Sequence, residues 1–384
     1  MSQKRWALVL LALCAAARAE TPPTPPIPQA EQSDVATLQP LTARRAFLWS
    51  GFLNPGIFIV DADKGEMEGY LPKSDWSGFA LAPGGKAYYV AETLWTHDTR
   101  GQRQDMIAVY DGTTLNLQKE IPLPGRALSV PKAQTFAVSE SGRYGYVYNL
   151  SPASSVVVVD LIQQKTVSSV ETPGCALVLP YGDAGFGSLC GDGSLATFGL
   201  DAKAHGTLKR SVHFFDAVRD PVFDQMALAV AARKVFFVSY LGHIYEATLG
   251  DEPQVMPAWS LQAAANLSEP KEESNEVAWR PGGSQLIAYH PPSGRLFVLM
   301  HVGEGWSHKR EAAEVWVLNA ATHALIRRIV LKEPAVNVAV SQDPTPVLLL
   351  TGHGPRLTVL DPDAGTVIRT VEAVNGGPIM TAAP

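Results

Sequence analysis

Two cysteines are the residues of this sequence whose spacing indicates covalent chemistry. Cys175 and Cys190 lie fifteen positions apart, on two apolar runs that predict neighbouring strands joined by a loop at residues 181–187. In an oxidising compartment two such cysteines form a disulfide. Closing that loop would stabilise the fold by on the order of 3 kcal/mol. A redox or metal-binding pair is the alternative interpretation, but it lacks both a CxxC spacing and a nearby group of histidines.

The other residue types that carry out catalysis are scattered along the chain. The closest grouping among the nine histidines is His290, His301 and His308, which we interpret as histidines that bond to neighbouring groups in a core or turn. Asp361 and Asp363 lie in a predicted turn, where an Asp side chain bonds to its own backbone. The sequence contains no GxSxG, HExxH, P-loop or CxxCH motif. We therefore predict no catalytic residue and no metal site on this chain.

A repeated pair of strands must position these residues. Its clearest copy, residues 155–174 (SVVVVDLIQQKTVSSVETPG), has four valines suited to a buried strand, a polar turn opened by Asp160, a second strand and a Pro-Gly stop. Copies with the same order begin at residues 57, 107, 195, 244, 315 and 357. Further apolar runs precede most copies, so four strands recur at spacings of about 41–68 residues, which is typical of β-propeller blades.

The two ends of the chain complement each other. Only a proline-rich stretch precedes the strand predicted at Arg45–Ser50, so the first blade lacks its innermost strand, while a spare strand lies at Pro378–Ala382. Pairing these two strands would close the ring and remove two exposed sheet edges. We therefore predict an all-β fold over residues 41–384: a seven-bladed β-propeller closed by a C-terminal strand in the first blade. Six or eight blades are alternatives, because residues 261–283 are long and irregular.

The N-terminal residues have the composition of an export signal. Lys4 and Arg5 precede an apolar run at residues 6–17, and Ala17-Arg18-Ala19 supplies the small residues of a cleavage site. We therefore predict a signal peptide over residues 1–19, cleaved after Ala19, and a periplasmic mature chain. Residues 20–40 form a proline-rich N-terminal arm, which is either a disordered spacer or a segment that orders against a partner subunit.

Composition excludes two classes of partner. The net charge is −6, and the sequence has no cluster of Lys and Arg such as phosphate contacts require, so we expect no nucleic-acid binding. No apolar run after the signal peptide approaches the roughly 18 residues needed to cross a membrane. The 46% of hydrophobic residues is enough for a substantial core.

Several segments are more specific than the repeat. They are residues 100–111 (RGQRQDMIAVYD), 151–160 (SPASSVVVVD), 174–175 (GC), 190–195 (CGDGSL), 238–245 (VSYLGHIY), 279–301 (WRPGGSQLIAYHPPSGRLFVLMH) and 307–318 (SHKREAAEVWVL). In this order, over nearly the whole mature chain, they resemble the heavy subunit of the quinone-dependent amine dehydrogenases, the family of aromatic amine dehydrogenase and methylamine dehydrogenase. Their spelling is nearer to the aromatic-amine branch.

The resemblance implies a periplasmic α2β2 heterotetramer. Its heavy subunit is a non-catalytic seven-bladed propeller without a cofactor of its own, and a separate small subunit carries tryptophan tryptophylquinone. Such enzymes deaminate primary amines oxidatively to aldehyde and ammonia and pass electrons to a blue copper protein, azurin- or amicyanin-like. The eight Trp of this chain are then packing residues of the core or of an interface.

The resemblance also implies a contribution to the substrate channel. Family members place a bulky residue over the quinone after the first strand of blade one, and the matching segment here, SGFLNP, puts Phe52 and Leu53 at that place. The alternative interpretation of Phe52 is a core residue. For the whole chain, the alternative hypothesis is a free-standing periplasmic propeller that binds a ligand or protein without a redox role.

Overall fold

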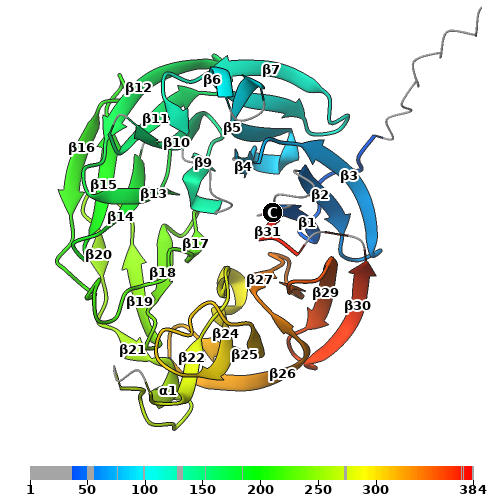
Figure 1. The fold of residues 1–384 in the computed structure, drawn as a ribbon, viewed down its shortest axis with the longest axis vertical. Coiled ribbons are helices and arrows are strands. Elements are labelled where there is room, and N and C mark those ends of the chain that lie inside the picture. The colour runs from blue at the N-terminus through cyan, green and yellow to red at the C-terminus, as the bar shows by residue number, and fades with distance from the viewer. Residues whose placement is uncertain are drawn as a thin grey trace, which may run out of the picture. The chain divides into compact units, whose positions relative to one another are not determined.

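A ring of seven antiparallel sheets makes up the fold. The structure is a computed structural model that describes residues 37–49, 56–75, 77–97, 100–127, 133–151, 153–183, 185–271, 275–372, 374 and 376–382. In the unit that begins at Thr37, the described residues form seven sheets that follow one another around a central axis (Figure 1). This arrangement confirms the predicted seven-bladed β-propeller, and we number the sheets blade 1 to blade 7 in chain order.

Each blade has four strand positions, counted from the axis outward. Blade 1 consists of β31 (Ile379–Thr381), β1 (Arg45–Trp49), β2 (Gly56–Asp61) and β3 (Glu66–Pro72). Blade 2 consists of β4 (Ser77–Leu81), β5 (Ala87–His97), β6 (Arg100–Asp111) and β7 (Leu117–Pro122). Blade 3 consists of β8 (Arg126–Ala127) with β9 (Phe136–Val138), β10 (Tyr144–Ser151), β11 (Ser155–Asp160) and β12 (Lys165–Glu171). Blade 4 consists of β13 (Cys175–Pro180), β14 (Gly185–Cys190), β15 (Leu195–Leu200) and β16 (Gly206–Arg210).

The remaining blades follow the same order. Blade 5 consists of β17 (Ala227–Ala229), β18 (Lys234–Val238), β19 (His243–Thr248) and β20 (Gln254–Val255) with β21 (Trp259–Ser260), and α1 (Leu261–Ala264) follows it. Blade 6 consists of β22 (Ala278–Pro281) with β23 (Ile287–His290), β24 (Arg295–Gly303), β25 (Ala312–Asn319) and β26 (Leu325–Ala335). Blade 7 consists of β27 (Asn337–Val340), β28 (Leu348–Thr351), β29 (Arg356–Asp361) and β30 (Thr366–Glu372).

Burial explains why the third strand of a blade is so apolar. Val156, Val157, Val158 and Val159 of β11 are all at most 1% exposed, because neighbouring blades cover both faces of the sheet. A strand buried on both faces needs a continuous apolar run rather than alternation. The outermost strand β12 has one covered face and shows the alternating pattern instead.

The turn between the third and fourth strands is held by one side chain in most blades. Asp61, Asp111, Asp160, Asn319 and Asp361 each end a third strand, and each accepts backbone N–H bonds from the residues two and three positions later. The acceptor lies on a short side chain that bends back over its own turn. The turn role predicted for Asp361 is therefore confirmed, whereas Asp363 pairs with Arg295 at 2.6 Å.

The ring closes as predicted. Strand β31 pairs antiparallel with β1, with Ala46 opposite Thr381 and Leu48 opposite Ile379. The side-chain amide of Gln285 adds a second fastening, because its Nε2 donates to the Ile379 oxygen (2.8 Å) and its Oε1 accepts from the Ile379 N–H (2.7 Å). The inner edge of β1 is thereby covered by the C-terminal strand.

Proline and glycine divide strands that the sequence predicts as continuous or leaves irregular. Pro257 separates β20 from β21, since proline has no N–H for the ladder. Gly282 and Gly283 directly follow β22 and lie between it and β23. The described part of the irregular stretch at residues 261–283 contains α1 and β22, and it leads from blade 5 into blade 6 rather than forming an additional blade. No helix in the described part of the chain is long and apolar enough to span a bilayer.

The ring has two faces with different connections. Because successive strands are antiparallel, the connections that follow second and fourth strands lie on one face, which we call the upper face. The connections that follow first and third strands lie on the lower face.

Leu38, in the predicted proline-rich arm, is buried among core residues of blades 1 and 2, and its N–H donates to the Thr113 oxygen (2.8 Å).

Candidate functional site

Three of the segments that the sequence singles out meet on the upper face of blades 5 and 6. Residues 238–245 contain the connection between β18 and β19. Residues 279–301 contain all but the first residue of β22 and the two glycines after it. Residues 307–318 begin in the connection between β24 and β25. The N–H of Gly283 donates to the His308 oxygen (3.0 Å), which joins the second and third segments directly.

An aromatic cluster forms where the segments meet. The rings of Tyr240 and His308 stack with centroids 4.1 Å apart, and Trp306 meets Tyr240 edge to face at 5.7 Å. Phe223 packs on the inner side of Tyr240 at 4.6 Å. Trp306 is 58% exposed, unlike Trp49 and Trp316, which are buried in blade cores. Exposed aromatic residues that rest on a rigid base are typical of docking surfaces.

A neutral histidine holds the loop that carries Trp306. The Ser307 hydroxyl donates to the Glu304 oxygen (2.7 Å), so the 2.8 Å contact between His301 Nε2 and Ser307 Oγ places the proton of His301 on Nε2. Burial, with the nearby charge of Arg310, lowers the pKa of His301 to about 4. Gly282 allows this close packing, because a Cβ there would lie 2.4 Å from His301 Nδ1.

The tip of this loop is strained at a bulky residue. Trp306 has a φ of 63°, in the left-handed region that residues other than Gly and Asn rarely occupy. This conformation costs on the order of 1 kcal/mol. It is maintained by the bonds of Ser307 and by the N–H of Arg310, which donates to the Ser307 oxygen (2.9 Å). This backbone conformation goes with an indole that is exposed and contacts Tyr240.

An ion pair lies next to the cluster. Asp220 accepts from His243 Nδ1 at 2.8 Å, and this hydrogen bond raises the pKa of His243. Ser239 Oγ approaches the same Nδ1 at 3.4 Å. In a Ser-His-Asp catalytic triad the serine and the aspartate bond to different ring nitrogens of the histidine, so these three residues do not form one. The pair borders a groove of about 870 Å³ between blades 4 and 5, which also includes His213 and Met256.

The disulfide fastens the upper end of blade 4. Cys175 and Cys190 are joined (S–S 2.10 Å) and lie directly opposite each other on β13 and β14. Both are 2% exposed, and the Tyr148 hydroxyl donates to the Cys175 oxygen (3.3 Å). The connection between the two strands spans residues 181–184, shorter than predicted, because residues 185–187 already belong to β14.

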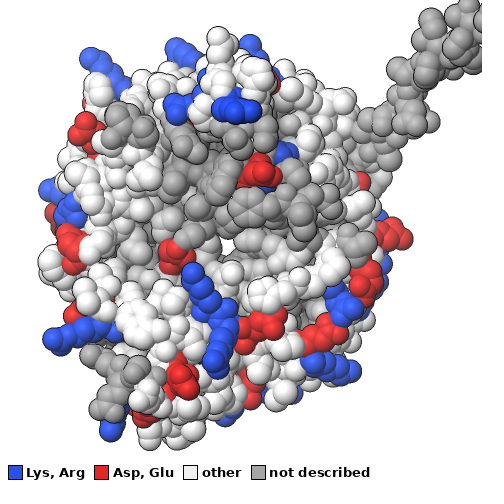
Figure 2. Space-filling model, in the orientation of Figure 1, with Lys and Arg blue, Asp and Glu red and all other residues white. Residues whose placement is uncertain are grey.

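Exposed apolar side chains recur on the upper face. They are Leu94, Leu150, Val212, Val218, Val277, Val302 and Trp306, each at least 38% exposed. Figure 2 looks onto one face of the ring and shows Lys and Arg interspersed with Asp and Glu, with uncharged surface between them. Interspersed charges with apolar residues between them suit a protein partner better than nucleic acid.

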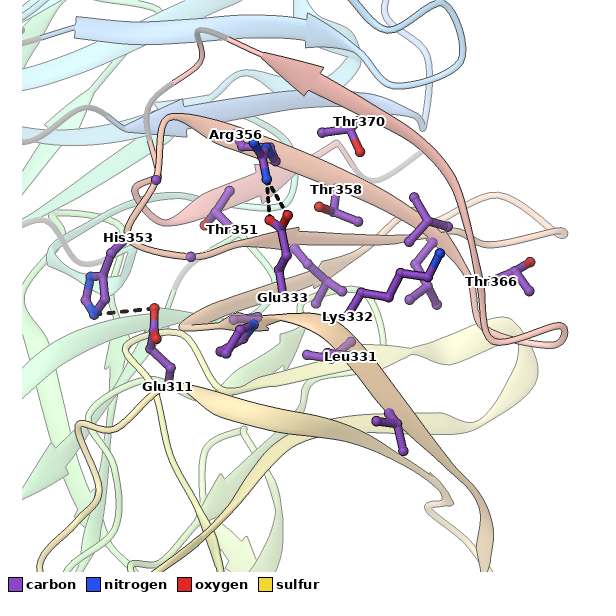
Figure 3. A pocket seen from close by; sticks show the side chains of 18 of the residues that line it. Glu311, Leu331, Lys332, Glu333, Thr351, His353, Arg356, Thr358, Thr366 and Thr370 are labelled. Atoms are coloured by element: carbon purple, nitrogen blue, oxygen red, sulfur yellow. Dashed lines mark hydrogen bonds and ion pairs between the residues drawn. The ribbon is translucent and has the colours of Figure 1, made fainter.

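A crevice at the side of the ring has a different character. About 670 Å³ in volume, it lies between β26 and the strands β29 and β30, and Figure 3 shows its threonines with two pairs, Glu333 with Arg356 and Glu311 with His353. Lys332 lines the same crevice. Among the described residues, no group of His, Cys, Asp and Glu side chains that could hold a metal ion is found there.

The three histidines that lie closest in the sequence do not form one cluster in the structure. His290 is buried near the lower face, where Nδ1 contacts Ser293 Oγ (2.8 Å) and Nε2 contacts the Asp343 oxygen (3.0 Å). His301 and His308 lie on the upper face as described above. Within the described ranges, no three His, Cys, Asp or Glu side chains are placed to hold a metal ion. Phe52 and Leu53 lie outside the described residues, so their channel role stays a prediction.

The fold and this surface define a class: a disulfide-bonded seven-bladed β-propeller whose upper face is suited to docking a protein. Solved structures share the fold at low identity: the dihydro-heme d1 dehydrogenase NirN (TM-score 0.54, 12% identity, 94% of this chain and 83% of that chain) and the β-propeller domain of Cps50 (Swd1) from Myceliophteria thermophila (TM-score 0.53, 9% identity, 88% of this chain and 96% of that chain). At these identities they show the fold alone.

The sequence comparison shows the family. Residues 52–383 match the family described as methylamine dehydrogenase heavy chain (MADH), and the chain belongs to it. The methylamine dehydrogenase heavy chain of Methylorubrum extorquens is 28% identical over 90% of this chain and 83% of its own length. That of Methylobacillus flagellatus is 26% identical over 80% and 76%, respectively. These relatives are named for methylamine, so the nearness to the aromatic-amine branch stays a prediction.

Proposed function

We propose that this chain is the non-catalytic heavy subunit of a periplasmic amine dehydrogenase. Family membership over residues 52–383 is the observation that carries the proposal. In the proposed enzyme, tryptophan tryptophylquinone on a separate small subunit supplies the redox chemistry by which a primary amine becomes aldehyde and ammonia. The residues described here support a docking role, because the family-like segments meet on a surface with exposed aromatic and apolar side chains.

The tryptophans of this chain fit packing and contact roles. Trp49 and Trp316 are fully buried, and the Nε1 of Trp316 donates to Glu314 (2.8 Å). Trp306 is the exposed member of the upper-face cluster, and we assign it to the small-subunit interface. Phe52 and Leu53 belong to the proposed channel over the quinone.

The proposal includes the assembly and its location. The signal peptide is removed after Ala19, and the mature chain enters an α2β2 heterotetramer in the periplasm. The disulfide of Cys175 and Cys190 supports an oxidising compartment. Electrons leave from the small subunit to a blue copper protein of the azurin or amicyanin kind.

The test is purification from the native host after growth on an amine. Under mild conditions the chain should co-purify with a small quinone-bearing subunit, and the complex should reduce a dye in the presence of methylamine or an aromatic primary amine. A lone, colourless and inactive chain would contradict the proposal and favour the free-standing propeller.

A matched pair of substitutions tests the docking face. Trp306→Ala on the upper face should reduce the amount of co-purified small subunit, because it removes an exposed aromatic contact. Ile162→Ala, in a lower-face turn where Ile162 is 73% exposed, should leave that amount unchanged. Equal effects of the two substitutions would contradict docking on the upper face.

A further inference from the structure

We propose that the upper face of blade 6 contains a carboxylate-binding pocket, based on Arg280, that receives one Asp or Glu side chain of the small subunit. This inference rests on the proposed function, because it names the chemistry by which the partner is recognised. It concerns a specific contact and not the assembly as a whole, so the two can fail separately.

Arg280 is a buried cation whose hydrogen bonds within the described residues go to neutral groups. Its side chain is 3% exposed, and it donates to the carbonyl oxygens of Gly303 (3.3 Å), Lys271 (3.3 Å) and Glu276 (3.5 Å). These bonds are long for charge-assisted contacts. Burial lowers the pKa of the guanidinium, while the nearby carboxylates of Glu276 and Asp220 act in the opposite direction. A buried arginine without a carboxylate partner is costly, and an incoming carboxylate would remove that cost.

The described carboxylates that influence Arg280 are engaged elsewhere. Glu276 accepts from the backbone N–H of Lys271. Asp220 accepts from His243 Nδ1 (2.8 Å) through one oxygen and from the Leu241 N–H (2.8 Å) through the other. No ion pair to Arg280 is formed within the described part of the chain. The cation is therefore left for a group from outside these residues.

The size of the pocket beside Arg280 suits one side chain. It has a volume of about 210 Å³, and Arg219, Tyr240 and Trp306 line it together with Arg280. Pockets for cofactors and drug-sized ligands are larger, about 300–1,000 Å³. The aromatic rings would cover the methylene groups of an acidic side chain while its carboxylate reaches the guanidinium. Arg219 is exposed at the opening and adds a second positive charge.

The residue types favour a protein partner over a small metabolite. Arg, Tyr and Trp are the side chains that most often carry the binding energy of protein interfaces, where they cluster in desolvated pockets. Trp306 lies at the opening in a left-handed conformation and is 58% exposed, so a partner protein could bury its indole on binding. Val218, also lining the pocket, is 79% exposed.

The experiment measures the dissociation constant of the complex between heavy chain variants and the small subunit. Arg280→Gln should raise the Kd by about 30-fold or more, because it removes one partner of a buried charge pair. Arg219→Gln, at the exposed opening, should raise the Kd by about threefold at low salt and less at high salt. The matched control is Arg233→Gln, an exposed arginine in a lower-face turn, which should leave the Kd unchanged.

A double-mutant cycle identifies the occupant. Each Asp and Glu of the small subunit is changed to Asn or Gln and combined with Arg280→Gln. One of these carboxylates should weaken binding to the wild-type heavy chain and add nothing to the effect of Arg280→Gln. Arg219→Gln gives the same test on a residue whose replacement leaves the core intact.

The outcomes separate the inference from the proposed function. If the wild-type chain binds no small subunit, the proposed function fails. If the wild type binds and neither Arg280→Gln nor Arg219→Gln changes the Kd, only the pocket is refuted. An Arg280→Gln effect that couples to none of the small-subunit carboxylates would also overturn the inference.

Discussion

The neutral state of His301 makes a quantitative prediction about acid stability. Its pKa in the folded chain is about 4, against an ordinary value of 6.5. Because the folded state binds the proton more weakly, the unfolded state carries more protons between these values, and stability falls as the pH falls through this window. A difference of about 2.5 units corresponds to about 3 kcal/mol of unfolding free energy, present above pH 6.5 and lost by about pH 4.

The geometry explains why protonation is unfavourable. Nε2 already donates to Ser307, so a second proton would go to Nδ1, which is buried and has no hydrogen-bond partner among the described residues. Arg280 and Arg310 would repel the new charge. Protonation should therefore loosen the loop that carries Trp306 before the whole ring unfolds.

The assay is urea unfolding of the wild type and of His301→Gln from pH 7.5 to pH 4. Glutamine keeps a donor near Ser307 but does not titrate, so the wild type should lose about 3 kcal/mol more than the variant across this range. The pKa shifts of His290 and His243 are present in both chains and cancel in the difference. Parallel pH profiles for the two chains would refute the burial argument.

Three further predictions follow from contacts elsewhere in the ring. Changing Cys190 to Ser should lower the unfolding free energy by about 3 kcal/mol, measured by denaturant unfolding, and reduction of the wild type should have the same effect. Gln285→Ala removes two bonds to β31 and should cost about 2 kcal/mol, with faster hydrogen exchange at Ile379; unchanged exchange would show that β1 alone holds this strand. Asp220→Asn should lower the pKa of His243 in an NMR titration. Since the wild-type pKa is raised, the stability from this pair is present below about pH 6.5 and lost as pH rises through the raised value.

The blades were predictable because their signals are local. A run such as Val156 to Val159 followed by Asp160 encodes a buried strand and the side chain that holds its turn within a few residues. The closing strand was predictable for a different reason. The first blade lacks an inner strand and the C-terminal residues supply a spare strand, so pairing the two covers both exposed edges.

The site was predictable only as a set of segments. The sequence singled out the stretches that contain Tyr240, Arg280 and His308, but their meeting depends on how blade 5 packs against blade 6. The left-handed conformation at Trp306 was also hidden, because the preceding Gly305 is the residue that such a conformation would ordinarily select. Three histidines near one another in sequence likewise separated to opposite faces, since β24 runs from one face to the other between His290 and His301.

The pairing of β31 with β1 also determines when folding of the ring can be completed. A chain that emerges from its N-terminus assembles blades 2 to 7 from neighbouring residues, but blade 1 has to wait for the last strand before its inner edge is covered. Until then β1 is an open template for another chain, and contacts across nearly the full sequence form slowly. Loss of a few C-terminal residues should therefore do more harm than their number suggests, and would appear first as aggregation of newly made chains.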